Sequence, residues 1–285
     1  MPVVISDLNP RARALIVALR EIRERYGITS RDLSIRMGFS HAFVSHWETG
    51  RRVPSPDEVA LLLGELRVTG EERDHLVALA AAAAQPNRIT QGVPGLPPHL
   101  VKAVDYERWA EEIVEWAPNS IPELLQTPEY TRSQAMLNGY AYTEIDARVL
   151  IRADRQAILD RADNPVRFTA LIGESALQES SGSPRVMVEQ LSRLVESAHQ
   201  PNISIQLVPD FIGWHPGLIG AFTIFHFAQS SEVLYFQHYG SGFFLAEYAD
   251  VDLHHRAVDI MRDKALTEPA SIKRIIKAAR KWAGI

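Results

Sequence analysis

The sequence predicts an all-α domain at the N-terminus followed by an α+β domain with a mixed four-stranded sheet. Apolar residues recur at helical spacing through residues 1–84, and runs rich in Ile, Val, Phe, Tyr and Thr occur only in the second half. Between these regions, residues 85–98 contain four Pro and two Gly with little periodicity. We therefore expect a domain at 1–84, a linker at 85–98 and a second domain at 99–285.

Helix-start signals predict five helices in the first domain. Asn9 and Pro10 start the first helix, because Pro fits the first helical turn. Ser55 is a good cap for another helix, and Thr69 precedes the last one. The other two helices are short and lie on either side of Gly38.

Residues 28–52 contain these two short helices and the turn between them. Thr29 can accept a hydrogen bond from a free backbone amide, and Asp32 adds negative charge to the first turn. Gly38 supplies the left-handed backbone that ends a helix, and Ser40 is expected to cap the next one. The segment therefore predicts a helix-turn-helix.

The second of these helices has two unlike faces. Val44 and Trp47 lie three residues apart and are expected to pack against the first helix. The opposite face carries small or polar side chains, namely His41, Ala42, Ser45 and His46. Because the major groove accepts such a face at a helix N-terminus, the pattern predicts binding to double-stranded DNA.

The spacing of this segment also resembles the Xre (lambda-repressor-like) family. The matching positions are Ser40, Ser45, Trp47, Glu48 and Gly50. The resemblance covers about residues 10–67 and implies that the helix at 40–49 reads the DNA. It further implies a structural ion pair between Arg23 and Glu48.

Two departures from the family affect the expected readout. Ser30 stands where these proteins usually carry Gln, and Ala42 cannot hydrogen-bond to a base. Specificity is then expected from His41 and His46, together with apolar contact between Ala42 or Phe43 and thymine methyl groups. Packing of Phe43 against the first helix or a dimer partner is the alternative. The implied base contacts are His41, Ala42 and His46, the implied phosphate contacts are Ser30, Arg51 and Arg52, and Ser40, Phe43 and Ser45 complete the candidate set.

Charge is divided unequally along the chain. Residues 1–53 carry nine Arg and five acidic residues, whereas the whole chain has a formal charge of −5. The first segment is thus at +4 and the remainder at −9. A basic DNA-binding domain on an acidic body fits this distribution, and so modest a positive charge favours binding as a homodimer.

Composition excludes several other classes. The chain has no Cys, which excludes disulfides, thiolate catalysis and Cys-based zinc sites. No apolar run reaches the ~18 residues of a membrane helix and no signal-peptide pattern is present, so we expect a cytoplasmic protein. P-loop and Gly-x-Ser-x-Gly motifs are absent, so neither catalysis nor a cofactor is expected.

His226 and His238 could face each other across a hairpin, but no carboxylate lies at ligand spacing, and no metal site is expected.

In the second domain, the sequence predicts an alternation of helices and strands. The expected strands are residues 166–172, 203–208, 221–227 and 233–239. The expected helices are residues 99–116, 143–162, 184–199, 251–265 and 271–282. Leu124, Leu125 and Tyr130 are expected in the core, with Thr127 capping the helix that Pro128 begins.

A second resemblance concerns residues 121–130, Ile-Pro-Glu-Leu-Leu-Gln-Thr-Pro-Glu-Tyr. They are similar to the Leu-Leu-Gln-Thr-x-x-Tyr signature of actinobacterial Xre regulators described as antitoxin-like, which often occur beside a small partner protein. Glu123 stands where these proteins usually have Gly, so a different local turn is expected. Arg152 and Arg155 form either surface salt bridges or a socket for an acidic partner segment.

Three functions remain open at this point. The first is a homodimeric, sequence-specific transcriptional regulator whose C-terminal domain receives a signal from a small partner protein. The second is a ligand-sensing regulator with a pocket lined by Trp214, Tyr235 and His226. The third is an antitoxin-like module that neutralises a small partner and binds DNA as feedback.

Overall fold

The computed structural model describes residues 10–83, 97–228, 230–239 and 241–284. The chain forms two compact units. One holds the first five helices and Phe227–Glu232, and the other holds most of the sheet and the remaining helices. Most of the predicted linker at 85–98 lies outside the described residues, so the domain limits stay predictions.

Five helices make the first unit, as the capping signals predict. They are α1 (Pro10–Arg25), α2 (Ser30–Arg36), α3 (Phe43–Glu48), α4 (Pro56–Glu65) and α5 (Glu71–Ala83). Ser55 and Glu58 form a reciprocal capping box at the start of α4. Trp47 of α3 is buried in one core with Leu15 of α1 and Leu62 of α4, so the helices share a single apolar centre.

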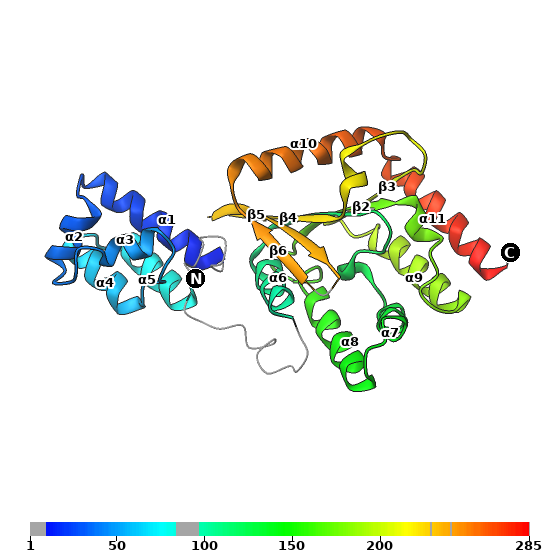
Figure 1. Ribbon diagram of the computed structural model, residues 1–285, viewed down its shortest axis with the longest axis horizontal. Coiled ribbons are helices and arrows are strands. Elements are labelled where there is room, and N and C mark those ends of the chain that lie inside the picture. Colours follow the sequence, from blue (N-terminus) through cyan, green and yellow to red (C-terminus); the bar gives the residue numbers. More distant parts are fainter. Residues whose placement is uncertain (1–9, 84–96, 229, 240, 285) are drawn as a thin grey trace. The chain divides into compact units, whose positions relative to one another are not determined.

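A six-stranded sheet forms the centre of the second unit. Its strands are β1 (Glu112–Ala117), β2 (Arg167–Gly173), β3 (Ile203–Val208), β4 (Phe222–Phe227), β5 (Ser230–His238) and β6 (Ser241–Leu245). Their order is β3-β2-β1-β4-β5-β6 (Figure 1). β1 pairs parallel with β2 and antiparallel with β4, and β2 pairs parallel with β3, so the sheet is mixed.

The predicted four-stranded sheet is therefore wrong by two strands. The predicted helix at 99–116 is α6 (Pro98–Trp109) followed by β1, because Ala110 turns the backbone to an extended conformation. Trp109, Ile113 and Trp116 mimic helical spacing, but β1 lies between two other strands and has buried apolar residues on both faces. β6 was not predicted at all, and it pairs antiparallel with β5.

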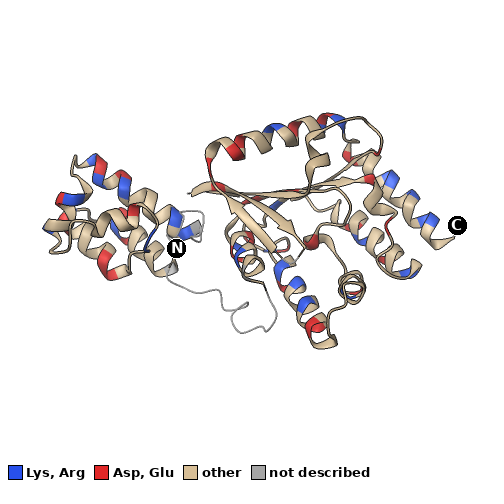
Figure 2. Cartoon of the chain, viewed as in Figure 1, with Lys and Arg blue, Asp and Glu red and all other residues tan. Residues whose placement is uncertain are grey.

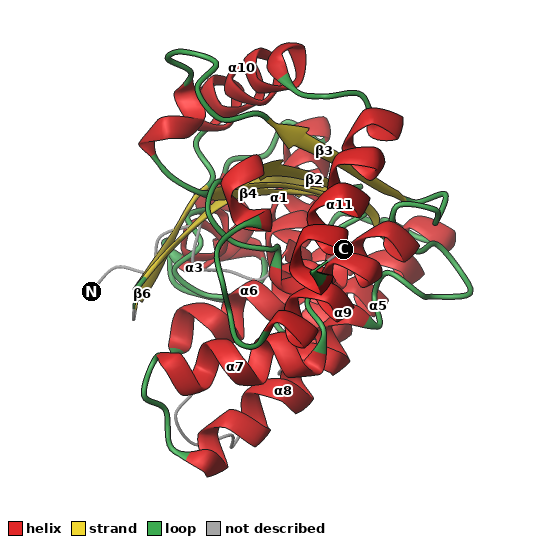
Figure 3. Ribbon diagram, turned by 90° about the vertical axis from the view of Figure 1, so that its right-hand side faces the viewer, coloured by secondary structure: helices red, strands yellow, loops and turns green. Residues whose placement is uncertain are grey.

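Helices cover both faces of the sheet. The remaining ones are α7 (Pro128–Leu137), α8 (Tyr142–Gln156), α9 (Pro184–Ser197), α10 (Tyr248–Lys264) and α11 (Glu268–Ala283). Figure 3 shows α10 on one face and α6, α7 and α8 on the other. Val258 and Met261 of α10 pack on Trp116 and Ile224 of the sheet. In the described part of the chain, none of the helices combines the length and apolar character needed to cross a membrane.

Short 3₁₀ segments connect these layers. They are η2 (Glu123–Leu125), η3 (Glu174–Leu177) and η4 (Pro216–Ile219). Leu124 and Leu125 are buried, as is Tyr130, and Thr127 accepts a hydrogen bond from the Tyr130 amide at 3.2 Å. These residues pack and cap as the sequence predicts.

Arg155 of α8 is the centre of a buried ion network. Arg155 Nε donates to Glu107 Oε2 of α6 at 2.8 Å, and Arg155 Nη2 donates to Glu107 Oε1 at 2.7 Å. The other terminal nitrogen, Nη1, pairs with Glu123 of η2. Arg152 pairs with the same Glu123 at 2.6 Å. The network therefore joins α6, η2 and α8.

Burial and charge act against each other at Glu123. Burial alone raises the pKa of Glu123, but Arg152 and Arg155 outweigh it and lower that pKa to about 2. The Arg155 side chain is only 6% exposed. Neither expectation from the sequence describes these arginines, because they point inward to carboxylates of their own domain instead of forming surface pairs or a partner socket.

Arg155→Ala should lower the free energy of unfolding of the second unit by about 3–5 kcal/mol, because it leaves the buried Glu107 carboxylate without its cation and Glu123 with Arg152 alone. Urea unfolding followed by tryptophan fluorescence measures this loss. Arg167→Ala is the control, since Arg167 is exposed and pairs with Glu112 at the surface, where a pair contributes about 0–1 kcal/mol. Equal losses in both variants would contradict a structural role for the network.

Candidate functional site

The helix-turn-helix is built from α2 and α3. Thr29 Oγ1 accepts a hydrogen bond from the Asp32 amide at 3.1 Å, which caps α2. Leu33 and Met37 are buried, and Gly38 has a φ of +79°, the left-handed backbone that ends the helix. Local sequence therefore determines both ends of α2.

The start of α3 differs from the expectation. α3 begins at Phe43, three residues after Ser40, and the Ser40 side chain does not cap it. Residues 41–42 form a turn in which the Phe43 amide donates to the Ser40 carbonyl at 3.0 Å. This turn separates Ser40 from the first residue of α3, so Ser40 is not the N-cap that the sequence predicts.

Ser34 joins the two helices in place of that cap. Its hydroxyl donates to the Ser30 carbonyl at 2.7 Å and accepts from the Val44 amide at 3.0 Å. Ser34 is fully buried and satisfies an amide at the start of α3 from a neighbouring helix. A Ser beside the apolar Leu33 in α2 was the one sequence signal for this contact.

The α3 segment presents the predicted outer face. His41, Ala42 and His46 are exposed and Ser45 is half-buried, whereas Val44 and Trp47 are buried. The structure thus brings the candidate base-reading residues together on one accessible surface. Hydrogen-bonding groups at this surface are the imidazoles of His41 and His46 and the hydroxyl of Ser45.

Phe43 has aromatic neighbours within its own domain. Its ring stacks on Phe39 with centroids 3.8 Å apart and meets Trp47 edge-on at 4.8 Å. The Arg52 guanidinium lies 5.0 Å from the centroid of the Phe43 ring. These contacts favour the packing alternative for Phe43 over contact with thymine methyl groups.

The two basic residues after α3 have different surroundings. Arg52 pairs with Glu58 of the α4 capping box. Arg51 is exposed, and within the described residues its guanidinium forms no ion pair. Ser30, half-buried at the start of α2, completes the set of candidate phosphate contacts. Arg51 therefore needs no rearrangement to meet a phosphate, whereas Arg52 must leave Glu58.

Arg23 and Glu48 lie together at the rear of α3. Arg23 Nε is 2.5 Å from Glu48 Oε1, and both side chains are 13% exposed. Arg23 also donates to the Ile28 carbonyl at 2.8 Å, and Arg20 donates to the Glu48 carbonyl at 2.5 Å. These bonds attach the C-terminal end of α3 to α1 and to the start of the helix-turn-helix.

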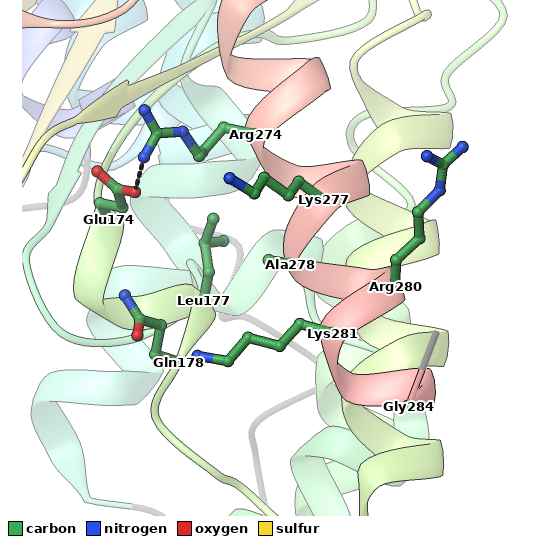
Figure 4. A pocket seen from close by; sticks show the side chains of 9 residues that line it. All are labelled: Glu174, Leu177, Gln178, Arg274, Lys277, Ala278, Arg280, Lys281 and Gly284. Carbon is green, nitrogen blue, oxygen red and sulfur yellow. Dashed lines mark hydrogen bonds and ion pairs between the residues drawn. The ribbon is translucent and has the colours of Figure 1, made fainter.

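A separate basic groove lies on the second unit between η3 and α11. Its volume is about 520 Å³, and it is lined by Glu174, Leu177, Gln178, Arg274, Lys277, Ala278, Arg280, Lys281 and Gly284. Figure 4 shows Arg274 paired with Glu174, and Lys277 and Lys281 extending from α11 toward η3. In Figure 2, the blue segments of the same helix mark its Lys and Arg positions. We call this hollow the α11 groove.

The residues of the ligand-sensor alternative do not share one cavity. Trp214 lines an apolar hollow with Phe236 and Leu253, whereas Tyr235 lines a different, polar cavity at the end of β1. Among the described residues, the histidine that lies against His226 is His255, with ring centroids 5.2 Å apart.

Ser34→Ala should destabilise the first unit by about 1–3 kcal/mol, because it leaves the buried Val44 amide without an acceptor. The loss is measured by hydrogen exchange of the Val44 amide together with thermal unfolding. Ser45→Ala is the matched control, since Ser45 is half-buried on the outer face and should change stability little. An unchanged Val44 exchange rate in Ser34→Ala would refute the role of Ser34.

Two family models match the chain. One, described as a helix-turn-helix domain, matches residues 14–76, and the other, described as a domain of unknown function (DUF5753), matches residues 100–277. No curated protein and no solved structure matches the chain. The first match indicates a DNA-binding regulator. Because the second match spans more than half of the sequence, the chain belongs to the DUF5753 family and carries a helix-turn-helix domain before the family's own domain.

Proposed function

We propose that this protein is a sequence-specific transcriptional regulator of the Xre type that binds DNA as a homodimer. The observation that carries the proposal is the two-sided α3 segment, in which Val44 and Trp47 are buried while His41 and His46 face outward. A recognition helix that enters a major groove needs one face packed against its own domain and an exposed face of small and polar side chains.

The exposed groups suggest how a base sequence would be read. Each imidazole can donate to or accept from a base edge, depending on its tautomer. Ala42 offers only a methyl group, which suits contact with a thymine methyl. Direct readout therefore depends mainly on His41 and His46, with Arg51 and the backbone near Ser30 setting the register on phosphates.

The small positive charge of the first segment supports the dimer. One copy of so weakly basic a domain gives low affinity at physiological salt, and two copies on a pseudo-palindrome add their contacts. Two recognition helices must then lie about 34 Å apart to enter successive major grooves.

Fluorescence anisotropy tests the proposal with DNA from upstream of the protein's own gene and with scrambled DNA, each at two salt concentrations. We expect tight binding to the native sequence that survives the higher salt, with two protomers per site by sedimentation analysis. Equal, salt-labile binding to both DNAs would refute sequence-specific regulation by the free protein.

His46→Ala and Arg51→Ala should separate base reading from phosphate binding. His46→Ala should weaken binding to the native site by about 1–3 kcal/mol and leave binding to scrambled DNA unchanged. Arg51→Ala should weaken binding to both DNAs and reduce the slope of log affinity against log salt by about 1 per protomer. If both variants lose affinity equally on both DNAs, the assignment of roles is wrong.

The second unit is proposed to receive a signal from a small partner protein, and the α11 groove supports this. Within the described residues, Arg274 pairs with Glu174, whereas Lys277, Arg280 and Lys281 have no ion-pair partner. The remainder of the chain after residue 53 is at −9, so a concentrated basic groove on it suits an acidic segment. Leu177 adds an apolar contact to the floor.

The double substitution Lys277→Glu and Lys281→Glu should weaken binding to the purified product of the adjacent gene by about tenfold or more, because like charges then face an acidic segment. Calorimetry with the two full-length proteins measures the change. Lys273→Glu is the control, since Lys273 is exposed on the same helix but does not line the groove. Equal loss in the control would show a general charge effect and no docking in the groove.

A further inference from the structure

A polar cavity lies where the parallel and antiparallel halves of the sheet meet. It occupies about 190 Å³ beside β1, β4 and β5, and its walls include Glu115, Glu123, Gln126, Gln134, Thr223 and Tyr235. Glu115 of β1 stands opposite Thr223 of β4 in the antiparallel ladder. We call it the Glu115 cavity.

Three carboxyl groups and two guanidinium groups lie close to one another around this cavity. Glu107 and Glu123 are held by Arg155 and Arg152, as described above. Glu115 is a third carboxylate, and among the described residues no side chain pairs with it or donates a hydrogen bond to it. Three carboxylates thus share two guanidinium groups, and the unmatched one is Glu115.

The surroundings of Glu115 make its ionised form unfavourable. Burial, followed by the nearby carboxylates of Glu123 and Glu107, raises the pKa of Glu115 to about 8. The half-buried Glu115 therefore holds a proton at neutral pH, and a cation that donates hydrogen bonds to the carboxylate stabilises its ionised form.

Tyr235 supplies an independent sign of a missing ligand. Its side chain is only 5% exposed, it lines the cavity, and its hydroxyl has no hydrogen-bond partner in the described structure. Buried hydroxyl groups in native proteins nearly always have a partner. Glu115 and Glu123 line the same cavity as Tyr235, so a molecule inside it can contact both Tyr235 and Glu115.

The size and polarity of the cavity limit what fits it. Among the described residues, the side chains whose ligand atoms lie close enough together to hold a metal ion are those of His226, Glu232 and His255, and none of these lines the cavity. The amides of Gln126 and Gln134 and the hydroxyl of Thr223 favour a polar occupant.

We propose that the Glu115 cavity binds a small organic cation, an alkylammonium or guanidinium compound. Its charged nitrogen donates hydrogen bonds to the Glu115 carboxylate, and its polar remainder bonds to the Tyr235 hydroxyl. The inference goes beyond DNA binding and does not depend on it, because the cavity belongs entirely to the second unit.

Isothermal titration calorimetry of the full chain, without DNA, tests this with ethanolamine and methylguanidine as probes. At least one should bind saturably to the wild type, and Glu115→Gln should weaken it by about tenfold or more. Tyr235→Phe should weaken it by about threefold to tenfold, because one hydrogen bond is lost. Glu111→Gln is the matched control, since Glu111 is exposed just before β1 and is not in the cavity wall.

Proton release distinguishes a cation on Glu115 from nonspecific binding. Methylguanidinium keeps its charge at neutral pH, so its arrival should expel the proton held by Glu115. Titrations in two buffers of different ionisation enthalpy should show proton release for the wild type and none for Glu115→Gln, whose fold is checked by circular dichroism. Absence of saturable binding for both probes, or equal affinity and proton release in the two proteins, would overturn the proposal.

Discussion

The second unit depends on one buried guanidinium, that of Arg155. From α8 it binds both oxygens of Glu107 in α6 and one oxygen of Glu123 in η2, and α6 and α8 cover the same face of the sheet. A buried ion pair adds little net stability compared with apolar packing, but losing one partner is costly. The network therefore fixes how α6, η2 and α8 fit together, while the apolar contacts of the sheet supply most of the stability.

Features with local causes could be predicted from the sequence. The cap at Thr29, the left-handed Gly38 and the capping box at Ser55 depend on residues within four positions of each other. β3 was predicted with its observed bounds because a run rich in Ile and Val lies between turn signals. β1 was missed because its character comes from β2 and β4, which lie far away in the sequence and bury it on both sides.

The candidate DNA-binding surface also combines features that local sequence predicts with features that depend on contacts between helices. The outward position of His46 follows from the helical spacing of Val44 and Trp47, whereas His41 is exposed in the turn before α3. The Ser34 contact with Val44 and the Arg52 pair with Glu58 both cross between helices, and no spacing rule reveals them. Similarly, whether Arg155 faced solvent or the core depended on Glu107, which stands 48 residues earlier.

Glu123 belongs both to the ion network and to the wall of the Glu115 cavity, and this links the two. A positive charge beside Glu115 also attracts Glu123, and thus competes with Arg152 and Arg155 for the same carboxylate. The helix that carries both arginines is α8, so occupancy of the cavity changes the balance of forces on that helix. A ligand shifts a protein's conformation only through such differential contacts. Glu123 is therefore the residue through which an occupied cavity would act on α8.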